Sequence, residues 1–417
     1  MDVAMGRKFL IIVGDGMADY PLPELGNRTP LQVAHMPNMD AIVPKSKLGL
    51  IRTIPEGLDK GSDTASLSIL GYDPRRSKVG RGALEAAARG IPIGEGDIAF
   101  RCNIITEEEG ILQDYSADHI SSEEARGLID ALKKEFVGGG ADLYAGLSYR
   151  NLLVLRDSGR RTFSTNIVTC PPHDVVGRPI PDVLPKASKE DGEDTAEYLR
   201  KLISKSKEAL ERHPINKTRT SRGGKPANMI WPWGQGGKPQ MQKFQAKYGL
   251  RAAVISAVDL IKGIGFYAGM DVVEVPGATG FYDTNYENKA DYALRALEDH
   301  DFVLLHVEAP DEASHAGDVK LKIKTVEDFD RRLVGRVLRQ IGGIVQNYRI
   351  AILPDHFTPI KVKTHTDDPV PFLIFDPHTK GDGVARFCEA SAKEGSLGLI
   401  EGCKLTEIMF KDRVGKA

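Results

Sequence analysis

The chain has 417 residues, of which 41% are hydrophobic and 27% are charged, as is typical of a globular protein. A single compact core seldom covers this length, so two domains are expected. The formal net charge of −2 argues against a general binder of nucleic acid or of membrane surfaces, because both attract strongly basic proteins.

Cysteine usage and the start of the chain both point to the cytoplasm. The four cysteines are far apart and form no C-x-x-C pair, which suits a reducing compartment and argues against a zinc finger or redox motif. The first residues lead almost at once into a strand-like run, without a cleavable signal. No stretch approaches the roughly 18 apolar residues of a membrane helix. We therefore expect a cytoplasmic protein without a membrane segment.

The first predicted strand is an apolar run over residues 9–13, which ends in Gly14-Asp15-Gly16. This turn is not a dinucleotide fingerprint, because the G-x-G-x-x-G pattern fails at Asp19, and no P-loop motif occurs elsewhere. Further on, a polar loop presents the hydroxyl of Ser62.

The middle of the chain predicts two clear helices. One begins after Ser121, whose spacing to Glu124 is that of a capping box, and the other spans about residues 191–212. Residues 78–241 contain loops rich in Pro, Gly and Arg but no cluster of metal-ligand residue types, which lie before and after this segment. We therefore predict a domain of residues 78–241 inserted into a discontinuous domain of residues 1–77 and 242–417.

Two further predicted strands, at 302–307 and 350–354, lead to Asp311 with His315 and to Asp355-His356. Between them, an apolar periodicity over residues 326–341 predicts a helix that stops at Gly342-Gly343. Short apolar runs that alternate with helical patterns are typical of α/β proteins. The predicted fold is a mostly parallel sheet flanked by helices, with a smaller α/β domain inserted.

Ligand groups collect at the carboxyl ends of parallel strands, so the acids and imidazoles above are expected to lie together. If residues 311–315 are helical, Asp311 and His315 share one face of the helix. Two metal sites are predicted from these residues. The first consists of Asp311, His315 and His365, and the second of Asp15, Ser62, Asp355 and His356.

Mixed carboxylate and imidazole ligation suits Mn²⁺, Zn²⁺ or Co²⁺, whereas Mg²⁺ favours oxygen ligands. Two ions about 3.5–4 Å apart stabilise the attacking and leaving oxygens of a phosphoryl displacement. A serine hydroxyl beside such an ion loses its proton readily and becomes a nucleophile. The alternative for any one of these residues is an ordinary hydrogen-bonded histidine or an N-capping aspartate, but their conjunction favours metal binding.

Longer motifs make the pattern specific. Residues 61–74 read GSDTASLSILGYDP, and further motifs are VGDGM (13–17), GRGALE (80–85), WPWGQG (231–236), PGATG (276–280), DTNY (283–286), EAPDEASH (308–315), PDH (354–356) and HTDDPVP (365–371). In this order they resemble the archaeal type of cofactor-independent phosphoglycerate mutases, members of the alkaline phosphatase superfamily. The resemblance covers essentially the whole chain.

The resemblance implies an alkaline-phosphatase-like fold and a glycolytic isomerase that interconverts 3-phosphoglycerate and 2-phosphoglycerate. Ser62 would carry the phosphoryl group as a phosphoserine. Two divalent ions are implied, with Mn²⁺ expected and Mg²⁺, Co²⁺ or Zn²⁺ as alternatives, and no 2,3-bisphosphoglycerate is required. The expected partner is a small-molecule substrate and neither nucleic acid nor a membrane, while the sequence leaves a homo-oligomer open.

The inserted domain is expected to hold the substrate. His119 is predicted to transfer a proton to the departing glycerate oxygen, with His173 as a further contact. Arg150 and Arg219 are predicted to bind carboxylate or phosphate, because a guanidinium can bind either in a bidentate manner. For all four, a surface or purely structural role is the alternative.

Three other functions stay open at this stage. A metal-dependent phosphatase, phosphonate hydrolase or sulfatase could use the same core residues. A homoserine-kinase-like paralogue would need a nucleotide, for which no known motif is present. A non-catalytic metal-binding or scaffold protein would have little use for the Ser62 loop.

Overall fold

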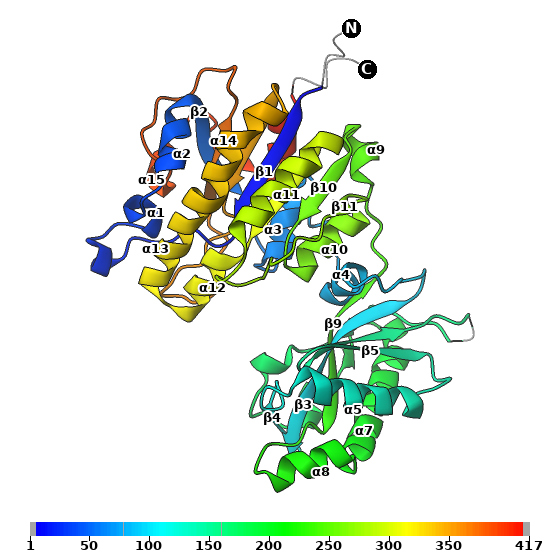
Figure 1. Ribbon diagram of the computed structural model, residues 1–417. Coiled ribbons are helices and arrows are strands. Elements are labelled where there is room, and N and C mark those ends of the chain that lie inside the picture. The colour runs from blue at the N-terminus through cyan, green and yellow to red at the C-terminus, as the bar shows by residue number, and fades with distance from the viewer. Residues whose placement is uncertain (1–5, 78, 160, 412–417) are drawn as a thin grey trace. The chain divides into compact units, whose positions relative to one another are not determined.

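The computed structural model describes residues 6–77, 79–159 and 161–411, and the chain divides into two compact units (Figure 1). The first, called the sheet unit, comprises Met1–Lys78 and Met241–Ala417. The second, called the inserted unit, comprises Val79–Gln240. The chain therefore leaves the sheet unit once and returns to it once.

An eight-stranded sheet forms the centre of the sheet unit. Its strands lie in the order β11 (Asp271–Val272), β10 (Ala252–Ile255), β12 (Phe302–Val307), β1 (Lys8–Gly14), β13 (Tyr348–Leu353), β14 (Val370–Phe375), β2 (Ser46–Arg52) and β15 (Leu399–Glu401). Neighbours from β11 to β13 are parallel, β14 is antiparallel to β13 and to β2, and β15 is parallel to β2. The predicted fold, a mostly parallel sheet in an α/β protein, is confirmed.

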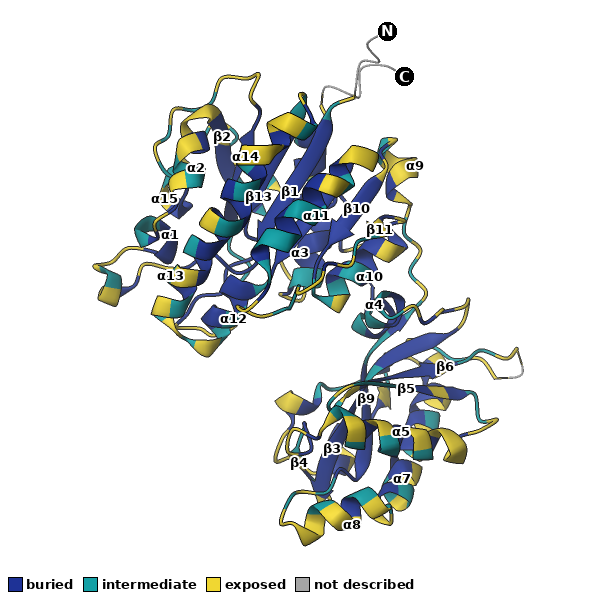
Figure 2. Cartoon of the chain, in the orientation of Figure 1, coloured by how far each residue is buried: buried dark blue, intermediate teal, exposed yellow. Residues whose placement is uncertain are grey.

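The central strands are buried on both faces. Every residue of β1 and β12 is buried, as Figure 2 shows for the middle of the sheet. Helices cover the sheet, and a strand covered on both faces is a continuous apolar run instead of an alternating one. The helices of this unit are α1 (Pro30–Val33), α2 (Pro37–Ile42), α3 (Ser62–Ile69), α9 (Phe244–Tyr248), α10 (Asp259–Tyr267), α11 (Tyr286–Asp299), α12 (Ala309–Ala316), α13 (Val319–Asp328), α14 (Gly335–Ile344), α15 (Glu389–Lys393) and α16 (Leu405–Met409).

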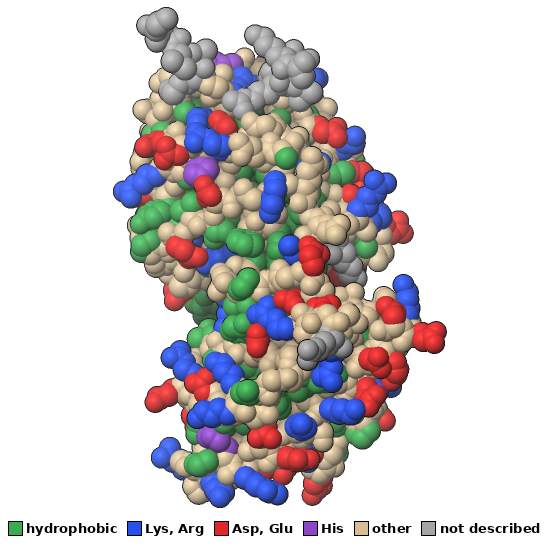
Figure 3. Space-filling model, turned by 90° about the vertical axis from the view of Figure 1, so that its right-hand side faces the viewer, with side chains coloured by type: hydrophobic (Ala, Val, Ile, Leu, Met, Phe, Trp, Pro, Cys, Tyr) green, Lys and Arg blue, Asp and Glu red, His purple; other side chains and the backbone are tan. Residues whose placement is uncertain are grey.

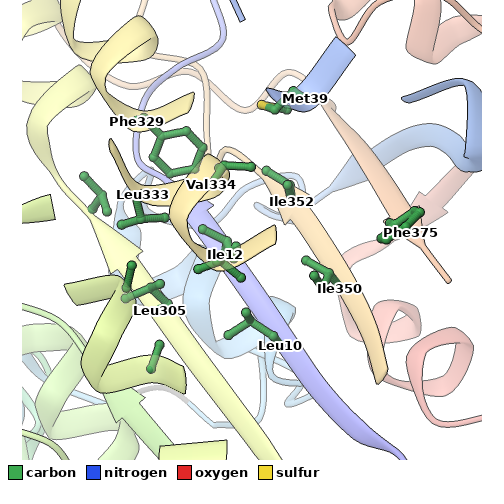
Figure 4. Packing of buried hydrophobic residues seen from close by; sticks show 14 of the residues in the cluster. Leu10, Ile12, Met39, Leu305, Phe329, Leu333, Val334, Ile350, Ile352 and Phe375 are labelled. Atoms are coloured by element: carbon green, nitrogen blue, oxygen red, sulfur yellow. The ribbon is translucent and has the colours of Figure 1, made fainter. Parts of the chain in front are cut away.

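The largest described core lies between the sheet and one layer of helices (Figure 4). Leu10, Ile12 and Leu305 from neighbouring strands pack against Phe329 and Leu333. The last two belong to a π-helical segment, Phe329–Val334, that joins α13 to α14. This packing holds the central strands in register, so the residues that follow their carboxyl ends are fixed relative to one another.

The predicted end of the helix at Gly342-Gly343 is wrong, because α14 continues through both glycines to Ile344. Ile344 packs against the core and Val345 is buried there. Burial of these side chains outweighs the roughly 1 kcal/mol by which glycine disfavours a helix relative to alanine.

The inserted unit is built on an antiparallel sheet whose long strand β3 (Ile98–Glu108) pairs with β4 (Ile111–Asp114), β6 (Arg150–Leu155) and β9 (Met229–Gly237). Besides the short 3-10 helices Pro172–Asp174 and Glu190–Gly192, its other described elements are α4 (Arg81–Ala88), α5 (Ser122–Glu135), β5 (Ala141–Leu147), β7 (Ile167–Val168), α6 (Ile180–Val183), β8 (Lys186–Ala187), α7 (Glu193–Glu211) and α8 (Pro214–Ser221). The capping box predicted at Ser121 is confirmed, since its side chain accepts from the Glu124 N–H at 3.2 Å.

Charge is distributed evenly where it can be seen. On the face in Figure 3, acidic and basic side chains of the described residues are interspersed, as a formal net charge of −2 suggests. No helix in the described ranges combines the length and apolar character needed to cross a membrane.

Candidate active site

Three adjacent parallel strands, in the order β12, β1, β13, deliver polar residues to the same end of the sheet. Asp15 follows β1, Asp355 and His356 follow β13, and Asp311 and His315 lie on α12 just after β12. Asp15, Asp355 and His356 have no exposed surface, and Asp311 is 3% exposed. Four of the predicted ligands therefore meet in a buried cluster, while His315 beside them is half-buried.

The first predicted ligand group is compact. One ligand atom from each of Asp311, His315 and His365 lies within 4.8 Å of the others. His315 Nε2 is 3.0 Å from Asp311 Oδ2 and 3.0 Å from His365 Nε2. The Nδ1 atoms of the two histidines face the carbonyls of Lys363 and Lys60, at 2.9 and 3.2 Å.

The carbonyl contacts fix the tautomers of both histidines. A carbonyl only accepts, so each Nδ1 carries a proton, and each Nε2 is left to bind either a second proton or a metal ion. Two Nε2 lone pairs at 3.0 Å would repel, so a proton or a metal ion must lie between these atoms. A metal ion fits this donor set, since metal-bound imidazoles usually donate their other N–H to a carbonyl or carboxylate.

The second predicted group surrounds Ser62. His356 Nε2 lies 3.4 Å from Asp15 Oδ1 and 3.4 Å from Asp355 Oδ2. The Ser62 hydroxyl is 3.1 Å from His356 Nε2 and donates to Asp15 Oδ2 at 3.3 Å. His356 Nδ1 lies 3.0 Å from the hydroxyl of Thr358, which itself donates to Asp311 at 2.6 Å. The lone pair on His356 Nε2 thus faces the carboxylates.

Gly16 allows the two ligand groups to approach. Its φ is +62°, in the left-handed region that side chains disfavour. A Cβ atom there would lie 2.6 Å from Asp311 Oδ1 and 2.7 Å from Thr358 Oγ1. Its N–H also donates to Asp355 at 3.3 Å. A larger residue would push the loop after β1 away from the other two.

Electrostatics in the cluster favour a cation. Burial, together with Asp355, Glu308 and Asp311, raises the pKa of Asp15 well above its usual value. Burial acts in the same direction on Asp311, but hydrogen bonds from His315 and His365 hold its pKa well below the usual range. Within the described residues, the buried Asp15 Oδ1 and Asp355 Oδ2 make no hydrogen bond. Buried charges normally pair or bind metal, so divalent ions fit these orphaned oxygens.

Sequence reasoning missed three residues beside the cluster. His306 interrupts the apolar run of β12, and its Nε2 is 3.3 Å from Asp15 Oδ2. Burial lowers the pKa of His306 to about 4 and raises that of Glu308 to about 8. Lys289 on α11 donates to the His306 carbonyl at 3.2 Å. A polar residue inside a buried strand was the available signal for His306.

The inserted unit brings three of the four predicted substrate residues together around aromatic rings. Tyr149 lies 6.2 Å from the His119 ring and 5.3 Å from the Arg150 guanidinium. Tyr115 lies 5.7 Å from Tyr149 and 6.1 Å from His173. His119, Arg150 and His173 are all exposed.

The turn that carries His119 is strained. Ala117, Asp118 and His119 all have positive φ, between 48° and 56°. Consecutive left-handed residues other than glycine are disfavoured, and such strain is most often found at functional sites. Asp114 holds the turn by accepting from the Ser116 and Asp118 N–H groups, at 2.8 and 3.2 Å.

Arg219 is engaged in the same turn. Its guanidinium donates to the Ala117 carbonyl at 2.7 Å, to Glu124 at 2.9 Å and to the Lys225 carbonyl at 3.0 Å. These contacts indicate that Arg219 stabilises the His119 turn, whereas Arg150 keeps its guanidinium exposed.

The sheet and the cluster together define an α/β enzyme with candidate metal ligands beside a serine hydroxyl. A family model described as 2,3-bisphosphoglycerate-independent phosphoglycerate mutase matches residues 44–216. A protein of that name from Methanothrix thermoacetophila is 50% identical over 97% of this chain and 99% of its own length. One from Methanosarcina acetivorans is also 50% identical, over 97% of this chain and 100% of its own.

Solved structures agree with this match. A protein from Pyrococcus horikoshii is 34% identical, with a TM-score of 0.82 over 99% of both chains. A cofactor-independent phosphoglycerate mutase from Thermoplasma acidophilum is 29% identical, with a TM-score of 0.70 over 97% of this chain and 99% of its own. The chain belongs to the family of 2,3-bisphosphoglycerate-independent phosphoglycerate mutases, which confirms the resemblance seen in the motifs.

Proposed function

We propose that the chain interconverts 3-phosphoglycerate and 2-phosphoglycerate without 2,3-bisphosphoglycerate, and that the phosphoryl group passes through Ser62. Relatives that carry the family name at 50% identity support the reaction. The observation that carries the route is the Ser62 hydroxyl, 3.1 Å from His356 Nε2 and 3.3 Å from Asp15 Oδ2.

Ser62 is suited to carry a phosphate for a short time. It is the first residue of the eight-residue helix α3, so a phosphate on its oxygen would lie at the positive end of the helix dipole. The Ser62 oxygen would attack phosphorus as the bond to the glycerate oxygen breaks, and Asp15 lies where it can accept the hydroxyl proton. The second hydroxyl of the retained glycerate would then take the phosphoryl group back.

Two divalent cations are part of this proposal. Asp311, His315 and His365 would hold one, and Asp15, Ser62, Asp355 and His356 the other. When bound, such ions supply positive charge that stabilises the transferring phosphoryl group and lowers the pKa of the serine hydroxyl. Mn²⁺ is the proposed ion, because three imidazoles among the ligands disfavour a purely hard cation.

The inserted unit is proposed to retain the glycerate between the two transfers. Arg150 presents an exposed guanidinium suited to carboxylate or phosphate, and His119 lies on a strained turn in the same aromatic cluster. We assign His119 the transfer of a proton to the departing glycerate oxygen, and His173 a supporting contact. Exclusion of water by bound substrate would favour isomerisation over hydrolysis.

One assay tests the reaction against its nearest rivals. Protein with Mn²⁺ and 3-phosphoglycerate, without 2,3-bisphosphoglycerate or nucleotide, is coupled to enolase while released inorganic phosphate is measured in parallel. The proposal expects 2-phosphoglycerate in large excess over phosphate. Phosphate as the main product would indicate a phosphatase, and turnover only with a nucleotide would indicate a kinase.

A further inference from the structure

Lys322 is a buried cation outside the predicted ligand set. It lies on α13, has no exposed surface, and donates to Asp19 Oδ2 at 2.8 Å, the Ala18 carbonyl at 3.1 Å and the Thr358 carbonyl at 3.0 Å. An ammonium has three N–H donors, so all three are used. Ala18 and Asp19 lie in the loop after β1, and Thr358 in the loop after β13. One side chain therefore joins the two loops that carry Asp15 and His356.

Asp19, the carboxylate partner of Lys322, also links the two loops. It is 1% exposed, and its Oδ2 accepts from the Ile360 N–H at 3.1 Å as well as from Lys322. The Asp19 N–H donates to Glu389 Oε1 at 3.1 Å, and Thr29 donates to Glu389 Oε2 at 2.6 Å. Both loops are thus anchored on one ionic network that is shielded from water.

Thr358 connects this network to the ligands. Its carbonyl accepts from Lys322, while its hydroxyl donates to Asp311 at 2.6 Å and lies 3.0 Å from His356 Nδ1. Because the hydroxyl proton goes to Asp311, the oxygen accepts the Nδ1 proton of His356. The Thr358 backbone position therefore sets both the tautomer of His356 and the orientation of Asp311.

We propose that Lys322 is a positioning residue that holds the loops after β1 and β13 at the spacing required for metal binding, acting through Thr358 on Asp311 and His356. A buried ion pair is expensive to desolvate and is weak evidence for added stability. We assign the Lys322–Asp19 pair the role of fixing the relative position of the loops after β1 and β13. This inference rests on the proposed metal site and adds residues that touch neither metal nor substrate.

The test compares Mn²⁺ binding to full-length Lys322→Met and wild-type protein by titration calorimetry, with circular dichroism to confirm folding. Loss of an outer contact to metal ligands typically weakens affinity about 10–100-fold, and we expect a loss in that range. The matched control is Arg349→Met. Arg349 is likewise buried, pairs with Asp376 at 3.0 Å and donates to the carbonyls of Ile408 and Met409. It lies near the start of β13, at the opposite end from the ligands.

The control should lose thermal stability but bind Mn²⁺ within about threefold of wild type. Folded Lys322→Met with wild-type affinity would overturn the inference. If that variant does not fold, Thr358→Val and Thr358→Ser test the same connection. The valine variant should bind Mn²⁺ about tenfold more weakly, and the serine variant should keep wild-type affinity. Equal Mn²⁺ affinities of these two variants would contradict the inference. Wild-type protein that binds no Mn²⁺ would instead refute the proposed metal site itself.

Discussion

The two units hold their polar groups in opposite ways. In the sheet unit, Asp15, Asp355 and His356 have no exposed surface and are fixed by the ends of packed strands. In the inserted unit, His119 and Arg150 are exposed and are supported by a strained turn and an aromatic ring. Charges that stabilise phosphoryl transfer work best when fixed away from water. Groups that admit and release substrate must stay accessible. The comparison suggests transfer chemistry in one unit and substrate retention in the other.

The largest expected effect is on transfer chemistry. Ser62→Ala should lower mutase activity by about 10³-fold or more, because loss of a nucleophile removes the covalent route. Ser68→Ala, in the same helix but outside the cluster, should keep activity within about threefold. The measurement is the enolase-coupled rate. Equal losses in both variants would show that α3 acts through its fold and not through the Ser62 hydroxyl.

Metal ligation should be the next most sensitive property of the sheet unit. His365→Ala should weaken Mn²⁺ binding by about 100-fold or more, since even outer-contact losses weaken it about 10–100-fold. His300→Ala is the control, because His300 pairs with Asp271 near the start of β12 and far along the strands from the cluster. Titration calorimetry measures both. Unchanged affinity in His365→Ala would remove this residue from the ligand set.

Metal affinity should also depend on pH. A hydrogen bond to Asp311 raises the pKa of His315 to about 9 in the metal-free protein, so His315 is protonated at pH 7. Mn²⁺ must displace this proton, and the apparent affinity should rise up to about tenfold per pH unit between pH 7 and 9. Calorimetry in buffers of different ionisation enthalpy counts the released proton. An affinity independent of pH in this window would mean that His315 does not ligate.

The smallest predicted effect concerns retention in the inserted unit. Arg150→Ala should raise the ratio of hydrolysis to isomerisation about 3–10-fold, and Arg150→Lys should restore it only in part, because an ammonium lacks the bidentate fork. Arg161→Ala is the control, since Arg161 also stacks on a tyrosine, Tyr198, but away from the cluster. Phosphate and 2-phosphoglycerate are measured together. If the ratio of hydrolysis to isomerisation is the same in all three variants, Arg150 does not contribute to retention of glycerate.

A variant of Arg219 distinguishes a structural role from substrate retention within the inserted unit. The sequence predicts that Arg219, like Arg150, binds an anion, but the Arg219 guanidinium already donates to Ala117, Glu124 and Lys225. We expect Arg219→Ala to lower the free energy of unfolding by about 1–3 kcal/mol, because two carbonyls and a carboxylate lose their donor. Chemical denaturation measures this. A changed product ratio at unchanged stability would restore the anion-binding prediction.

The central strands and the acidic residues that follow them could be predicted, because they leave a strong local signal. Strands buried on both faces are continuous apolar runs. In a parallel sheet, the residues that follow neighbouring strands lie at the same edge, and this rule predicted that Asp15, Asp311 and Asp355 lie close together. Lys322 could not be found in this way. It lies in a helix with two other lysines and two acids, and only tertiary packing shows that Lys322 is the fully buried lysine.

The extent of α14 and the internal contacts of Arg219 were not predicted, for a similar reason. A glycine pair usually marks a helix end, but packing of Ile344 against the core lets α14 continue past it. A basic loop is usually solvated surface, but the Arg219 guanidinium donates to the Ala117 carbonyl. Long-range contacts of this kind have no signature in neighbouring residues.

The most direct test of the account is the location of the transferred phosphate. Protein incubated with 3-phosphoglycerate and Mn²⁺ is quenched in acid, digested and mapped by mass spectrometry, with Ser62→Ala treated in parallel. The account predicts a phosphopeptide with the modification on Ser62, absent from the variant. Turnover without any phosphopeptide, or phosphate on Ser66 or Ser68, would contradict it.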